Sequence, residues 1–94
     1  MLTTTGIRLT TEREPTPTMR FHLIGIGGAG MSALARLLHA QGIAVSGSDL
    51  VETPTLHALR ALGIHAYSPH DPQQMGAPDW VVVSDAVHPD NPEV

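Results

Sequence analysis

The sequence predicts an α/β domain: part of an open parallel sheet of about four strands with helices on both faces. Short apolar runs alternate with stretches in which apolar residues recur every three or four positions. The pairs Gly42-Ile43 and Gly63-Ile64 each stand between an expected helix and an expected strand, so one strand–helix unit is repeated. Such alternation implies right-handed crossovers between parallel strands. Numbering the expected strands along the chain, we predict the spatial order 3-2-1-4.

Length and composition favour one small domain. The chain has 94 residues, a formal charge of -4, no cysteine and no basic run, which argues against nucleic-acid binding. No segment is apolar for long enough to cross a bilayer, so we expect a soluble cytoplasmic protein without a membrane partner. We take residues 1–18, rich in threonine, as a flexible leader with a weak strand signal at 7–9, and residues 19–94 as the domain.

The first strand–helix unit begins directly after the leader. Residues 21–26 form an apolar run that ends in glycines and predicts a buried parallel strand. Apolar residues then recur on one helical face, and Gly42 is placed to end that helix in a left-handed conformation. The buried face consists of Met31, Leu34, Ala35 and Leu38.

The second unit follows the same plan. Residues 43–47 predict a strand, and Thr53-Pro54 predict a helix start with a threonine cap and proline in the first turn. Its expected buried stripe is Leu56, Leu59 and Leu62.

The remaining elements are short. Residues 64–67 and 80–83 predict two further strands, with one helical turn at 72–75 between them. Trp80 is expected in the core. Residues 90–93 are expected to begin another helix.

A glycine-rich loop between the first strand and helix points to binding of a diphosphate. Gly25 permits a tight turn, Gly27 lets the backbone approach an anion, and Gly30 lets the helix lie close to the strand, as in Rossmann-like domains. Main-chain N–H groups in the first helical turn, around Ala29 to Ser32, then face the anion. Asp49 stands where such domains carry an acidic residue for a ribose hydroxyl.

Residue chemistry alone leaves the ligand open. A dinucleotide in an oxidoreductase, a nucleotide sensed by a regulatory module, a sugar nucleotide, or a purely structural turn would each explain the glycines. The chain has no lysine, which excludes a P-loop. Six histidines occur without the spacing of metal ligands, so we expect no metal site.

Longer motifs narrow the choice among these explanations of the glycine loop. The run HLIGIGGAGMS at 22–32 is followed by VSGSD at 45–49, VVVSDAV at 81–87 and DNPE at 90–93. Together they resemble the start of the Mur ligases, ATP-dependent enzymes of peptidoglycan synthesis, and in particular the member that joins L-alanine to UDP-N-acetylmuramate. The resemblance covers about residues 20–94.

The resemblance implies a three-domain enzyme whose first domain binds the UDP part of UDP-N-acetylmuramate. It assigns the diphosphate to the helix-opening loop and the uridine to Ser48 and Asp49, with His70, Ser84 and Ala86 bordering the nucleotide. The loop residues are Gly25, Gly27, Gly28, Ala29, Gly30, Met31 and Ser32. Asp85 departs from the small hydroxyl residue usual in the family, and its negative charge argues against a phosphate contact there.

The same resemblance implies that ATP and Mg²⁺ act in the longer parent enzyme. The lysines and carboxylates that bind them in the family have no counterpart in this chain. We therefore expect a substrate-binding segment that binds no cofactor, performs no catalysis alone, and works with the remaining Mur ligase domains.

Overall fold

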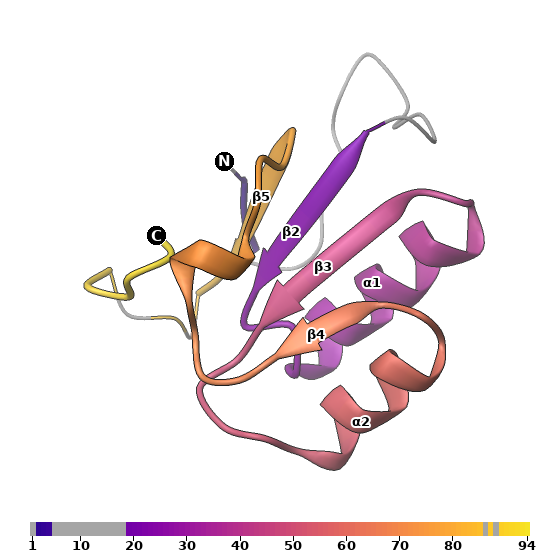
Figure 1. Ribbon diagram of the computed structural model, residues 1–94, viewed down its shortest axis with the longest axis horizontal. Helices are drawn as coiled ribbons and strands as arrows, with labels where there is room; N and C mark the ends of the chain where they lie inside the picture. Colours follow the sequence, from indigo (N-terminus) through magenta and orange to yellow (C-terminus); the bar gives the residue numbers. More distant parts are fainter. Residues whose placement is uncertain (1, 5–18, 86, 88) are drawn as a thin grey trace.

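A computed structural model describes residues 2–4, 19–85, 87 and 89–94. Its five parallel strands form one sheet in the order β1-β5-β2-β3-β4 (Figure 1). The strands are β1 (Leu2–Thr4), β2 (Arg20–Ile24), β3 (Ala44–Ser48), β4 (His65–Tyr67) and β5 (Trp80–Ser84). The helices are α1 (Ala29–Ala40), α2 (Pro54–Ala61) and the one-turn 3-10 helix η1 (Pro72–Gln74).

Strand order confirms the predicted arrangement of the four main strands. β2 lies between β3 and β5, with Leu23 opposite Gly47 on one side and Val82 on the other. The additional strand β1 pairs with β5 at the edge of the sheet, with Leu2 opposite Val82. It falls within the segment expected to be a leader, whereas the weak strand signal at 7–9 lies outside the described residues.

The core lies between the sheet and the two α-helices, which cover the same face (Figure 1). The sequence predicts helices on both faces, whereas the described residues place only the one-turn helix η1 on the other face. The apolar face of α1 is buried as predicted, and it meets Phe21 and Leu23 of β2. Trp80 packs against this core, and its ring stacks on Phe21 with 6.4 Å between centroids, which confirms its core assignment.

Helix ends follow the predicted signals with one exception. Thr53 caps α2 by accepting a hydrogen bond from Leu56 N–H at 3.4 Å, while Gly42 and Gly63 take the left-handed conformation after their helices. The exception is Leu62, expected in the buried stripe but 44% exposed. It follows the last residue of α2, and the turn there directs its side chain to solvent.

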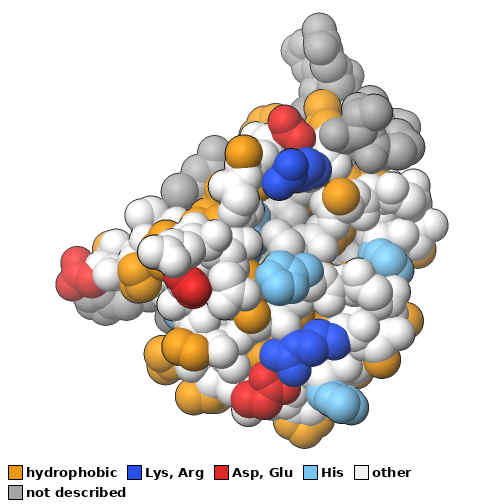
Figure 2. Space-filling view, viewed as in Figure 1, with side chains coloured by type: hydrophobic (Ala, Val, Ile, Leu, Met, Phe, Trp, Pro, Cys, Tyr) orange, Lys and Arg blue, Asp and Glu red, His pale blue; other side chains and the backbone are white. Residues whose placement is uncertain are grey.

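The opposite face of the sheet is crossed by the connection from β4 to β5, which contains η1 in the predicted position. Residues 90–93 form turns, so the helix expected to begin there is absent from the described segment 89–94. Figure 2 shows this face, on which the visible basic side chains each lie beside an acidic one. Among the described residues no helix has the length and apolar character needed to cross a bilayer.

Candidate functional site

The glycine loop makes the tight turn expected at the carboxyl end of β2. Gly25 has φ of +88°, which favours glycine, and its N–H and that of Ile26 both donate to the Ser48 carbonyl, at 2.8 and 3.0 Å. Gly28 N–H then donates to the Gly25 carbonyl at 3.1 Å. These bonds fix the loop against the end of β3 and set the direction in which α1 begins.

α1 begins with donors available to an anion. Gly28 occupies the cap position and provides no side-chain acceptor, and the first turn contains no acidic residue. Gly28, Ala29 and Gly30 are exposed, and the N–H groups of Ala29 and Gly30 precede the first bond within the helix, from Ser32 N–H to the Gly28 carbonyl. The positive end of the helix dipole lies here, so a negatively charged group would be stabilised.

A cleft of about 700 Å³ opens at this carboxyl edge of the sheet. It contains five of the residues predicted for the site: Gly25, Gly27, Gly28, Asp49 and His70, and a sixth, Ser84, comes from the end of β5. The other lining residues are Leu50, Thr53, Val87, Asp90, Asn91 and Pro92. A parallel sheet places ligand sites in such a crevice, where neighbouring crossovers lead away in opposite directions.

Asp49 is held against the glycine loop. One carboxylate oxygen accepts a hydrogen bond from Gly27 N–H at 2.8 Å, and the other accepts from Leu50 N–H at 2.7 Å. The acidic residue after β3 therefore meets a main-chain donor of the loop. Asp49 is also one of the residues that line the cleft.

Ser84 packs close to the first glycine. A side chain added at Gly25 would place its Cβ 3.0 Å from Ser84 Cβ, so the ends of β2 and β5 nearly touch. Asp85 follows as an exposed residue, and it is not part of the cleft lining among the described residues. The predicted site residue Ala86 lies outside the described residues.

Two loop residues predicted for the site point elsewhere. Met31 is buried in the core beneath the loop. The Ser32 hydroxyl donates to the Ala29 carbonyl at 3.1 Å, within the first turn of α1. Their main-chain groups belong to the helix start, but their side chains do not line the cleft.

Ser48 is fully buried behind the cleft wall, within a polar cluster that the sequence analysis did not predict. This polar cluster comprises His22, Ser48, Tyr67, His70 and Glu93, and it lies on the face of the sheet opposite the α-helices. One Glu93 oxygen accepts from Ser48 Oγ at 2.5 Å and from His22 Nε2 at 2.8 Å. The other accepts from Tyr67 OH at 2.6 Å and from Asp71 N–H at 2.6 Å. Glu93 is thus a buried carboxylate with two donors on each oxygen.

These contacts keep the Glu93 carboxylate ionised. Burial alone would raise its pKa, but the hydrogen bonds from Ser48, Tyr67, His22 and the Asp71 N–H outweigh burial and hold the pKa below its usual value. The pKa of Tyr67 is raised, first by burial and then by its hydrogen bond to Glu93. Tyr67 therefore remains a neutral donor.

His22 is a core histidine whose two ring nitrogens both have partners. It is fully buried, its Nδ1 lies 2.8 Å from Ser46 Oγ, and its Nε2 meets Glu93. Polar residues at alternate positions of strands expected to be buried were the available signal for this cluster, since buried polar groups require partners.

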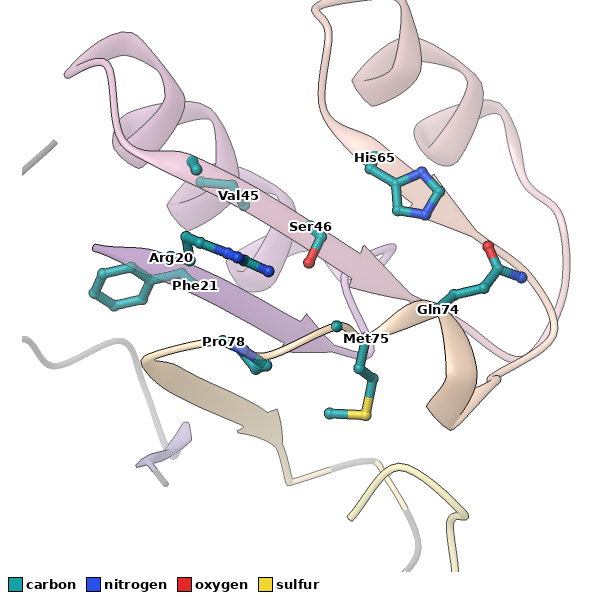
Figure 3. Close-up of a pocket in the computed structure, with 10 residues that line it drawn as sticks. Arg20, Phe21, Val45, Ser46, His65, Gln74, Met75 and Pro78 are labelled. Carbon is teal, nitrogen blue, oxygen red and sulfur yellow. The ribbon is translucent and has the colours of Figure 1, made fainter. Parts of the chain in front are cut away.

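A second, smaller pocket of about 180 Å³ lies nearer the amino ends of the strands (Figure 3). Figure 3 shows Arg20, Ser46 and His65 from the sheet on one side of it and Gln74 and Met75 on the other. It contains none of the predicted site residues. Within the described part of the chain, no group of three His, Cys, Asp or Glu side chains is arranged to hold a metal ion.

Comparison with known proteins agrees with the motifs. Residues 20–94 match the Mur ligase family, catalytic domain. The UDP-N-acetylmuramate–L-alanine ligase of Kineococcus radiotolerans is 53% identical over 78 residues, which are 80% of this chain and 17% of that protein. The ligase of the same name from a Sulfurihydrogenibium species is 48% identical over 75 residues, covering 80% of this chain and 16% of that protein.

A solved structure shares the fold. The crystal structure of UDP-N-acetylmuramate-alanine ligase from Thermotoga maritima superposes with a TM-score of 0.77 at 44% sequence identity, over 80% of this chain and 17% of that one. The chain thus spans about 17% of the length of the proteins it resembles. With its family match over residues 20–94, this chain belongs to the Mur ligase family and corresponds to the N-terminal region of its UDP-N-acetylmuramate–L-alanine ligases.

Proposed function

We propose that the chain is the UDP-binding domain of a cytoplasmic ligase that joins L-alanine to UDP-N-acetylmuramate in peptidoglycan synthesis. The cleft at the carboxyl edge of the sheet is the observation that carries this proposal, because it brings together the glycine loop, Gly28 at the cap of α1, and Asp49. The names of the relatives support the choice of a UDP-sugar over a dinucleotide.

In this proposal the diphosphate lies at the start of α1. The N–H groups of Ala29 and Gly30 donate to its oxygens, and the helix dipole favours its negative charge. Asp49 accepts from a hydroxyl or N–H group of the uridine, while Ser84 and Ala86 border the nucleotide. These residues bind and orient the substrate, and the reacting carboxyl group of the muramate extends beyond them toward the remaining domains.

ATP and Mg²⁺ belong, in this proposal, to other parts of the ligase. This chain has no lysine, and no group of carboxylates or histidines in its described residues is arranged to hold a metal ion. Its own residues therefore do not fit either group, and we assign it no part in forming the acyl phosphate or the amide bond.

Calorimetric titration of the 94-residue chain with UDP-N-acetylmuramate, UDP and NADH tests the proposal. Saturable binding of UDP-N-acetylmuramate and UDP without binding of NADH is expected. Binding of NADH without either uridine nucleotide would contradict it and would favour the dinucleotide alternative. The affinity for UDP alone measures how much of the binding free energy of UDP-N-acetylmuramate this domain contributes, because the sugar and lactyl groups are expected to contact other domains.

A further inference from the structure

The cleft is short of positive charge for an anionic ligand. Asp49 and Asp90 line it, and among its described lining residues His70 is the one side chain that can become a cation. The helix dipole offers only a partial charge. A protonated His70 would supply the full charge that a diphosphate requires, so the groups that control its proton matter for binding.

His70 is connected to the buried Glu93 through the Ser48 hydroxyl. Its Nδ1 lies 2.6 Å from Ser48 Oγ, which donates its single proton to Glu93 at 2.5 Å. Because that proton is already used, Ser48 can only accept from His70, and Nδ1 must carry a hydrogen. Nε2 is then the ring nitrogen left for a ligand in the cleft.

Glu93 also lies near enough to act on the charge of the ring directly. Its carboxylate is 3.9 Å from His70 Nδ1, and the His70 side chain is only 8% exposed. At this distance the negative charge of Glu93 acts on the imidazole ring.

We propose that Glu93 is a positioning residue for the nucleotide site, which acts through Ser48 to hold His70 with its hydrogen on Nδ1 and with Nε2 directed to the diphosphate. When the diphosphate binds, Nε2 takes up a proton and donates a charge-assisted hydrogen bond to a phosphate oxygen. This inference rests on the proposed function for its ligand, but its account of His70 in the free protein is independent of any ligand.

Other titratable groups lie around the hydrogen-bonded relay from Glu93 through Ser48 to His70. His22, Tyr67 and the Asp71 N–H each donate a hydrogen bond to Glu93. The negative charge of the Asp71 carboxylate contributes to the raised pKa of Tyr67. On the cleft side, Asp49 and Asp90 add negative charge to the lining that His70 shares.

Nuclear magnetic resonance of the ring nitrogens tests the free protein. In the unsubstituted chain, His70 is expected to carry its ring hydrogen on Nδ1, while exposed His65 provides a reference. Ser48→Ala should shift His70 toward the Nε2 form. Ser46→Ala is the matched control, since Ser46 contacts His22 on the same face of β3 and should leave His70 unchanged. An Nε2 hydrogen on His70 in the unsubstituted chain would overturn the relay.

Titration with UDP between pH 5.5 and 8.5 tests the bound state. Glu93→Gln is expected to lower affinity by about tenfold at pH 7, because the hydrogen bond from His70 to the phosphate loses the carboxylate that orients the ring through Ser48. The titration of UDP itself is common to both proteins and cancels in the comparison.

A double-mutant cycle separates this role from a general loss of structure. His70→Asn keeps a donor for Ser48 but cannot become a cation, so Glu93→Gln should have no further effect on UDP affinity in that background. An equal loss in both backgrounds would mean that Glu93 acts only on the fold, and would overturn the inference. If the unsubstituted chain binds UDP and Glu93→Gln has the same affinity and pH profile, the inference about Glu93 is wrong but the proposed function stands. If the unsubstituted chain binds no UDP at any pH, the proposed function itself is wrong.

Discussion

The carboxylate of Asp49 accepts a hydrogen bond from the main-chain N–H of Gly27, with 2.8 Å between the oxygen and the nitrogen. This contact joins the end of β3 to the glycine loop after β2, so the acidic residue and the loop form one unit. In the proposed function, a nucleotide that enters the cleft meets Asp49 and Gly28, the cap residue of α1, together.

Replacing Asp49 by alanine is expected to weaken UDP binding by about 1.5 to 3 kcal/mol, the range for a hydrogen bond to a charged group. Asp49→Asn is the matched variant, because its amide oxygen can still accept from Gly27 N–H. Calorimetry on both separates the two roles. Recovery in Asp49→Asn assigns the effect to loop geometry, whereas equal loss assigns it to the charge. Unchanged affinity in Asp49→Ala would place Asp49 outside the site.

Gly27→Val is expected to abolish UDP binding while circular dichroism stays close to that of the unsubstituted chain. An added Cβ would lie 2.6 Å from an Asp49 oxygen, so the carboxylate must leave the loop and the new side chain takes space in the cleft. Gly28→Ala controls for folding, since its Cβ meets only the Gly25 carbonyl, at 3.5 Å. Retained affinity in Gly27→Val would contradict the position assigned to the diphosphate.

Gly47→Ala is expected to lower the free energy of unfolding by about 1 to 3 kcal/mol, the usual cost of overpacking a core. Gly47 is buried on β3, and its Cβ would overlap the Ile26 side chain and approach the Leu23 carbonyl to 2.7 Å. Urea unfolding measures the change, with Gly28→Ala again as the control. A midpoint equal to that of the unsubstituted chain would show that β3 and the loop are less tightly packed than described.

Stability is expected to fall in acid because of Glu93. The pKa of Glu93 is lower in the folded chain than its usual 4.5, so the unfolded chain binds more protons in this range. The contribution of Glu93 is therefore complete above pH 4.5 and declines as the pH falls through the lowered folded value. Thermal unfolding from pH 7 to pH 3 should show this loss, and Glu93→Gln should remove that part of it. An identical acid dependence in both proteins would contradict the ionised, hydrogen-bonded state of Glu93.

The sequence predicts the elements whose signals are local. Periodicity and the glycines at 42 and 63 predict the two units, and the spacing from Gly25 to Asp49 predicts which residues meet at the carboxyl edge. Leu62 shows the limit of periodicity. The apolar spacing in the sequence continues to Leu62, but α2 has already ended at Ala61.

Features that depend on contacts between distant parts of the chain could not be predicted from the sequence. The pairing of β1 with β5 joins residues 2–4 to residues 82–84, and nothing beside β1 indicates its partner. Gly47 resembles any small strand residue until the Ile26 side chain is seen against it. Glu93 lies in a segment expected to start a helix, and its partners come from three other parts of the chain, so its role could be read only from the folded structure.

The exposed opening turn of α1 has a consequence for evolution. A donor that belongs to the peptide backbone survives every replacement of the residue that carries it, apart from proline. Homologous chains could therefore drift at position 29 without losing recognition, and selection would act mainly on bulk and backbone angle. In the proposed function, reagents that modify lysine would leave the contacts between this chain and the diphosphate intact, because the chain contains no lysine.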